Sequence, residues 1–173
     1  MSRTEKAAIL FEMLCDQYDG AEALGKKAAQ KMFYFFEREG IDLNLKYGIH
    51  FYGPYSSKLD DEMYVLESEG YISINTDGPT HIIKRGTRAA EDGALSDREK
   101  EIVKYVMSIF GHKSPLDLEA LSTMDYIANS ILCPGVSDDE IINKFKQIKG
   151  TKFTQHVTED ALRELRVLKL IAS

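Results

Sequence analysis

The stretch LKYGIHFYGPYSSKLDDEMYVLESEGYISINTDGPTHIIKRG, residues 45–86, decides the fold. Its first eight residues, 45–52, are rich in aromatic and β-branched types, so they predict an extended segment that Gly53-Pro54 breaks. A weak capping box formed by Ser57 and Asp60 then predicts a helix that stops at Gly70. Residues 71–85 follow as two short apolar runs around a DGP turn, which is typical of a β-hairpin.

Two helices precede this stretch, at about 4–18 and 24–38, each with apolar residues at a period near 3.6. Helix, helix, extended segment, helix and hairpin is the order of a winged helix, with the hairpin as the wing. We therefore expect a winged-helix-like module over residues 24–86. Residues 86–95 are small and polar, and they form the best candidate linker.

Four more helices are expected beyond the linker. Their predicted starts are Ser96 with Glu99, Ser114 with Pro115, Ser137 with Glu140, and Thr158. The predicted fold class is therefore mainly α with a small β-hairpin. It consists of a winged-helix-like module and a C-terminal helical bundle over 96–173, packed with residues 4–18 into a single compact domain over 1–173.

The composition argues against several classes of function. The net charge of −6 does not favour a surface that binds phosphates. The longest strongly apolar run is too short to span a membrane, and the first residues do not read as a secretory signal. Two isolated cysteines, Cys15 and Cys133, favour a reducing compartment, so we expect a cytoplasmic protein.

The sequence contains no catalytic constellation that a known chemistry requires. The four histidines are scattered, and the acidic clusters at 60–62 and 138–140 lie in the first turns of predicted helices, where negative charge stabilises the helix. We therefore expect no enzyme activity, no metal site and no cofactor.

Nucleic-acid binding through the usual reading helix is unfavourable. The helix just before the wing carries one lysine, Lys58, against five acidic residues, which opposes the electrostatic attraction that DNA binding needs. A patch for DNA in another pose stays open as the alternative, and it would use six basic residues: Lys26, Lys27, Lys31, Lys84, Arg85 and Arg88.

Six of the nine tyrosines fall between residues 34 and 71. Tyrosine combines an apolar ring with a polar tip and is common at interface hot spots. Tyr52 and Tyr55 bracket Gly53-Pro54, where a turn would hold them near the surface. Packing inside the module is the alternative for these tyrosines.

These residues resemble a known family. The tract GKKAAQKMFYFF followed by KYGIHFYGPYSSKLDDEMYVLESEGYI resembles the Panacea domain, the SocA-like antitoxin group, and the related YwgA-type bacterial proteins of unknown function. The matching positions are Lys27, Gln30, Lys31, Tyr34, Tyr52, Gly53, Pro54, Tyr55, Ser56, Leu59, Leu66, Gly70 and Ile72. Ala29 departs from the pattern, and residues 151–168 are similar more loosely.

The resemblance implies a non-catalytic domain, often an antitoxin that binds a toxin directly. We therefore expect a regulatory protein-interaction domain whose partner is a protein, such as a toxin, in preference to DNA. The partner-binding residues expected are Tyr52, Gly53, Pro54, Tyr55, Ser56 and Lys58. The acidic helix after the turn suits a basic partner. A homodimer stays open.

Overall fold

The computed structural model describes residues 2–18 and 23–172. The chain forms two compact units. Unit 1 comprises residues 1–47 and 56–113, and unit 2 comprises residues 48–55 and 114–173. The short segment 48–55 therefore belongs with the C-terminal helices, although it interrupts unit 1 in the sequence.

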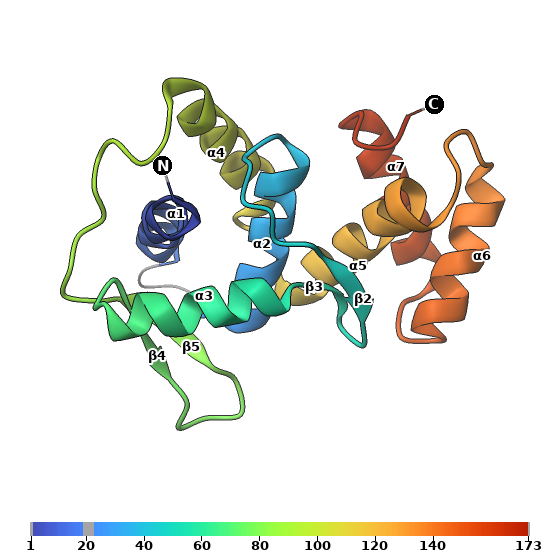
Figure 1. Cartoon of the computed structure of the whole chain (residues 1–173). Helices are drawn as coiled ribbons and strands as arrows, with labels where there is room; N and C mark the ends of the chain where they lie inside the picture. The colour runs from blue at the N-terminus through green and yellow to red at the C-terminus, as the bar shows by residue number, and fades with distance from the viewer. Residues whose placement is uncertain (1, 19–22, 173) are drawn as a thin grey trace. The chain divides into compact units, whose positions relative to one another are not determined.

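Four helices build most of unit 1, and Figure 1 shows them in blue through olive. They are α1 (Arg3–Gln17), α2 (Lys26–Arg38), α3 (Ser57–Ser68) and α4 (Asp97–Phe110). Aromatic side chains fill the core between them. The ring of Phe35 on α2 stacks on Phe110 of α4 at 3.8 Å, and Phe33 lies 4.6 Å from Phe11 of α1. Such contacts explain why α2 is apolar on more than one face.

Unit 1 also contains a three-stranded antiparallel sheet of order β1-β5-β4. The strands are β1 (Leu24–Gly25), β4 (Ile72–Asn75) and β5 (Ile82–Arg85). The predicted hairpin over 71–85 is confirmed, with Ile74 opposite Ile83 in its register. The prediction of a mainly helical protein with a small amount of antiparallel sheet is also confirmed.

Unit 2 combines a small hairpin with helices. The hairpin strands are β2 (Gly48–His50) and β3 (Gly53–Tyr55). The helices are α5 (Pro115–Tyr126), a short π-helical turn (Ile127–Ile131), α6 (Asp138–Lys149) and α7 (Gln155–Val167). Every residue of α5 from Leu118 to Asp125 is buried. The α5 helix contacts α6, α7 and β3, so it is the central element of this unit.

Side-chain capping marks the starts of the described α-helices except α2, which follows Gly25. The capping boxes predicted at Ser96 and Ser137 are both present, and Ser114 caps α5 with Pro115 in its first turn. Two predicted starts are wrong. Ser56, not Ser57, caps α3, and α7 begins after Thr154, not at Thr158, because the Thr154 hydroxyl accepts a hydrogen bond from the Val157 amide.

The predicted break at Gly53-Pro54 is also wrong, because both residues lie in β3. Pro54 pairs with Ile49, and the turn consists of Phe51 and Tyr52 instead. Gly53 follows that turn with a φ of 91°, a left-handed conformation that glycine adopts at no steric cost.

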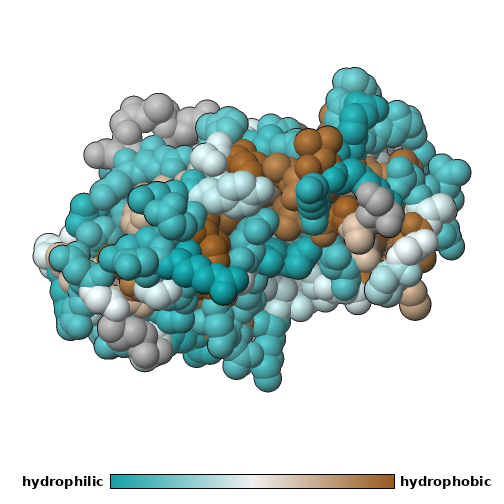
Figure 2. Space-filling model, turned by 90° about the horizontal axis from the view of Figure 1, so that it is seen from above, coloured by the Kyte–Doolittle hydropathy of each residue, from teal (hydrophilic) through white to brown (hydrophobic). Residues whose placement is uncertain are grey.

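The predicted C-terminal segment over 96–173 is divided between the two units. Residues 96–113 lie in unit 1, where Lys6 of α1 forms an ion pair with Glu99 of α4 at 2.6 Å, whereas residues 114–173 lie in unit 2. That the whole chain forms one compact domain stays a prediction. No helix in the described part of the chain is long and apolar enough to cross a membrane. Figure 2 shows a face dominated by hydrophilic residues, with apolar residues gathered in a few patches.

Candidate functional site

The turn between β2 and β3 exposes two neighbouring aromatic side chains. Phe51 is 80% exposed and Tyr52 is 54% exposed. Their rings meet edge to face at 4.9 Å, so each ring partly fixes the other. We call Phe51 and Tyr52 the aromatic tip. It is the largest concentration of exposed aromatic surface on adjacent residues in the described part of the chain.

A buried ion cluster anchors this aromatic tip to the helices of unit 2. Glu119 of α5 is fully buried, and Lys149 at the end of α6 donates to its carboxylate at 2.6 Å. The same Lys149 ammonium donates to the backbone carbonyl of Phe51 at 2.9 Å. A charge buried in this way is stable only when it is paired and hydrogen-bonded, so the cluster fixes the turn relative to α5 and α6.

Lys152 also belongs to this ion cluster. Its ammonium donates to both carboxylate oxygens of Glu119, at 2.7 and 3.0 Å. The same group lies over three aromatic rings, at 4.9 Å from the centroid of Tyr52, 5.9 Å from that of Phe51 and 5.8 Å from that of Phe153. These are cation–π distances, and the side chain is still 31% exposed. Positive charge therefore lies beside the aromatic tip.

Close packing holds the strand that follows. Gly53 and Pro54 are buried, and a Cβ atom on Gly53 would lie 2.5 Å from the Oγ1 atom of Thr123 on α5. Tyr55 is half-buried against the ring of His50, at 4.7 Å between centroids. Of the four residues expected in this hairpin, only Tyr52 is therefore well exposed, and the other three hold the turn in place.

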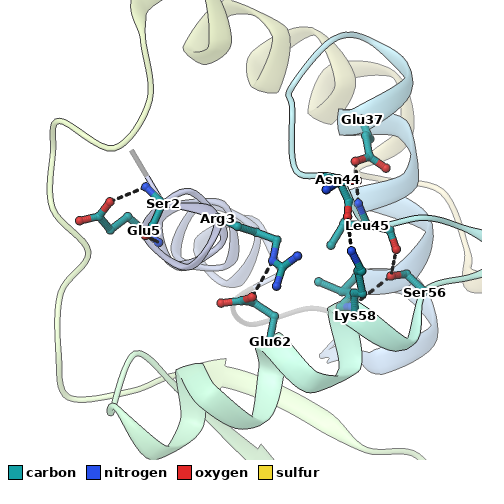
Figure 3. Close-up of polar contacts among 10 residues, drawn as sticks. Ser2, Arg3, Glu5, Glu37, Asn44, Leu45, Ser56, Lys58 and Glu62 are labelled. Carbon is teal, nitrogen blue, oxygen red and sulfur yellow. Dashed lines mark hydrogen bonds and ion pairs between the residues drawn. The ribbon is translucent and has the colours of Figure 1, made fainter.

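The last two expected partner-binding residues, Ser56 and Lys58, belong to unit 1 (Figure 3). Ser56 is buried and donates from its hydroxyl to the carbonyl of Leu45 at 2.6 Å, while the same oxygen caps α3. The Lys58 ammonium donates to the Asn44 carbonyl at 3.4 Å. Both side chains therefore hold the loop that leads into the hairpin.

A half-buried carboxylate supports the same loop. Glu37 of α2 accepts the backbone amide of Leu45 at 2.9 Å (Figure 3). Burial raises the pKa of Glu37, although amides of the loop partly offset that effect. In this loop Asn44 and Lys46 adopt positive φ values of 52° and 53°. These contacts stabilise a backbone conformation that non-glycine residues rarely adopt.

Three of the six basic residues of the alternative DNA patch lie against carboxylates, and a fourth is buried. Lys31 is buried, and Lys26 lies 3.6 Å from Asp60. Arg85 pairs with Glu12 and Asp16, both at 2.9 Å, and Arg88 lies 3.8 Å from Glu69. Lys84 is exposed, and Lys27 is half-buried.

Sequence reasoning missed four residues of the site. Phe51 stands next to Tyr52 but does not belong to the cluster of tyrosines that predicts this surface. Glu119, Lys149 and Lys152 come from distant parts of the chain, and no fixed spacing joins them. One signal was available, since the segment 141–158 contains four lysines and no acidic residue.

Two titratable groups outside this site, Cys15 and Tyr47, have raised pKa values. No group of three or more metal-ligating side chains gathers among residues 2–18 and 23–172. Burial raises the pKa of the Cys15 thiol to about 11, and it raises the pKa of Tyr47 as well. Both effects favour the neutral, unreactive form at physiological pH.

Comparison with known proteins gives a distant relative. The chain is similar to the uncharacterized protein YwgA of Bacillus subtilis (strain 168), with 27% identity over 158 residues that cover 88% of this chain and 92% of that protein. No family model matches the chain. The YwgA-type resemblance is therefore supported, whereas the resemblance to the Panacea domain has no support from this comparison.

Proposed function

We propose that this protein is a non-catalytic, regulatory protein-interaction module that binds its partner through the aromatic tip. The observation that carries this proposal is the exposure of Phe51 and Tyr52 on a turn that buried ion pairs and a close glycine contact hold in place. Aromatic side chains on a rigid turn lose little entropy on binding, and such residues dominate interface energies.

We also propose the finer fold of each unit. In unit 1 the order helix, strand, helix, helix and hairpin, with β1 beside β5, is the topology of a winged helix, so we propose a winged-helix-like unit. It includes α1, which the predicted module over 24–86 left out. In unit 2 we propose a small helical bundle around α5. Function does not follow from either fold alone.

DNA binding is the weaker candidate. A winged helix that binds DNA needs cations available for phosphates. Here Arg85 and Arg88 lie against carboxylates, and Lys31 is buried. The α3 helix, which precedes the hairpin, exposes Asp61 and Glu67, and its C-cap residue Glu69 is exposed as well. These charges would repel the DNA backbone, so protein binding is favoured.

We also propose a class of partner and a cellular compartment. A toxin encoded next to this protein is one partner of the proposed kind, as the antitoxin resemblance implies. The free thiols of Cys15 and Cys133 suit the reducing cytoplasm, where we propose that the protein acts.

Photo-crosslinking tests the proposal directly. Phe51 is replaced by p-benzoylphenylalanine in the native host, with Val167 replaced in the same way as the control, since Val167 is 75% exposed in the same unit. We expect one discrete adduct from position 51 and none from position 167. Adducts of equal yield at both positions, or none at position 51, would contradict the proposal.

A growth assay tests the antitoxin form. The product of the adjacent gene is expressed with the wild-type chain, with Phe51→Ser, or with Val167→Ser. An antitoxin that uses the aromatic tip restores growth as wild type and as Val167→Ser, but not as Phe51→Ser. If the neighbour does not inhibit growth at all, the antitoxin form is wrong, and the crosslinking result alone decides on protein binding.

A further inference from the structure

The surface beside the aromatic tip has a local charge that differs from that of its unit. Unit 2 as a whole carries seven Lys and Arg against nine Asp and Glu. The segment 141–158, which includes most of α6 and the start of α7, carries four lysines and no acidic residue. Basic charge is therefore concentrated where α6 ends, next to the turn that carries Phe51 and Tyr52.

The lysines of this segment have different roles. Lys149 is buried, with its side chain 2% exposed, and it contacts Glu119 and the Phe51 carbonyl. Lys152 pairs with the same carboxylate but stays partly exposed at the rings. Lys146 is exposed and lies three residues before Lys149, which places it on the preceding turn of α6. Lys144 is half-buried, so Lys146 and Lys152 are the two exposed lysines of this segment and supply most of its surface charge.

From this arrangement we infer that the aromatic tip docks an acidic protein segment, one that presents an apolar side chain to Phe51 and Tyr52 and carboxylates to Lys146 and Lys152. This inference rests on the proposed protein-binding function and names the chemistry of the partner. Apolar contact supplies most of the affinity, whereas the charges orient the segment and speed its association with the surface.

A single-stranded nucleic acid would also need aromatic residues and lysines, but the geometry favours a protein segment. Bases stack on open ring faces. Here the two rings lie at 88° to one another, and the Lys152 ammonium lies over the Tyr52 ring.

Selection from a random library tests the inference. A phage library of random 12-residue peptides is selected on the immobilised full-length chain, and the enriched peptides are synthesised and measured in solution. We expect enrichment in Asp and Glu around one large apolar residue. Binding should weaken about 30-fold for Phe51→Ser and about fivefold for Lys146→Glu.

Matched variants serve as controls. Val167→Ser removes a similarly exposed apolar side chain, and Lys84→Glu makes the same charge change on the hairpin of unit 1, so both should bind like the wild type. Peptides that depend on Phe51 but are basic or uncharged would overturn the acidic chemistry and leave the proposed function intact. The absence of any peptide that depends on Phe51 would overturn both.

Two other occupants of this surface, a nucleic acid and a second copy of the chain, are tested with the same variants. A 20-nucleotide oligothymidine that binds more tightly than the best peptide, and loses binding in Phe51→Ser, would show a nucleic-acid site and overturn the inference. Sedimentation of the wild type as a dimer that Phe51→Ser converts to a monomer would show that a second copy occupies the tip, and it would overturn the inference as well.

Discussion

Replacing Gly53 with alanine should destabilise the protein by about 3 kcal/mol, because two separate costs coincide at this residue. The first cost is conformational: the φ of 91° lies in a region where a side chain costs roughly 1–2 kcal/mol. The second cost is steric. The new Cβ would lie 2.5 Å from Thr123 Oγ1 and 3.6 Å from the carbonyl oxygen of Glu119. Overpacking of this kind costs about 1–3 kcal/mol.

Gly135→Ala provides a matched control that isolates the conformational cost. Gly135 belongs to the same unit and has a φ of 85°, but nothing lies within 4 Å of its added Cβ. We expect a loss of about 1 kcal/mol for this variant. The difference between the two variants, about 2 kcal/mol, then measures the contact with Thr123.

Guanidinium denaturation followed by far-ultraviolet circular dichroism provides the assay, with thermal unfolding as the second measurement. A loss of 3 kcal/mol should lower the midpoint by about 6–12 °C for a chain of this size. Thr123 is buried and its hydroxyl has no hydrogen-bond partner among the described residues, so Thr123→Ala removes the clashing atom without breaking such a bond. In that background Gly53→Ala should cost only about 1 kcal/mol.

Two results would refute the reasoning. The first is a Gly53→Ala variant that is no less stable than Gly135→Ala. The second is a penalty that Thr123→Ala leaves unchanged, because the hairpin would then not pack on α5 as described.

Three further predictions concern buried and titratable groups. Lys149→Met leaves a buried carboxylate with one cation fewer and should destabilise the protein by about 3 kcal/mol, whereas Arg163→Gln at the surface should change the stability by less than about 0.5 kcal/mol in the same titration. Iodoacetamide at pH 8 should modify Cys133 in the native protein and reach Cys15 only after unfolding, because Cys15 is buried and its pKa is about 11; equal rates in mass spectrometry would contradict this. Burial raises the pKa of Glu99, but hydrogen bonds from Lys6 and Ser96 outweigh it and lower the pKa below its usual 4.5. The stability from Glu99 is therefore complete above that pH and is lost as the pH falls through the lowered value, so Glu99→Gln should flatten the acid limb of a stability–pH curve.

The sequence predicted those parts of the fold that depend on local chemistry. The capping boxes at Ser96 and Ser137 place helix starts because a serine hydroxyl and a glutamate three residues later satisfy each other's backbone amides. The start of α7 was misplaced because Thr154 caps it without an acidic residue at the third helical position. Thr158, the predicted start of this helix, lies inside it, and its hydroxyl donates to the Thr154 carbonyl.

The candidate site was only partly predictable because its anchor is not local. The clustering of tyrosines beside Gly53-Pro54 identifies Tyr52. The ion pair of Lys149 and Glu119, however, joins residues that are 30 positions apart, and Lys149 donates to a carbonyl 98 residues away. No periodicity connects such positions in a single sequence. Gly53-Pro54 looked like a break because proline lacks an amide hydrogen, yet a strand of three residues at the edge of a two-stranded hairpin accommodates it.

The buried cluster of Glu119, Lys149 and Lys152 is better explained by positioning than by stability. Apolar residues of similar volume often stabilise a core as well as a buried ion pair does. What an apolar residue could not do is donate to the Phe51 carbonyl, as Lys149 does, or hold a cation against the Tyr52 ring, as Lys152 does. The residue positioned in this way, Phe51, leaves 80% of its surface in water and so gains little from folding. Val167 is nearly as exposed, but a single exposed apolar side chain on a helix is ordinary. A turn that is fixed by buried charges and yet keeps its aromatic rings in solvent is preorganised for contact with another molecule, which is why we assign recognition to the aromatic tip.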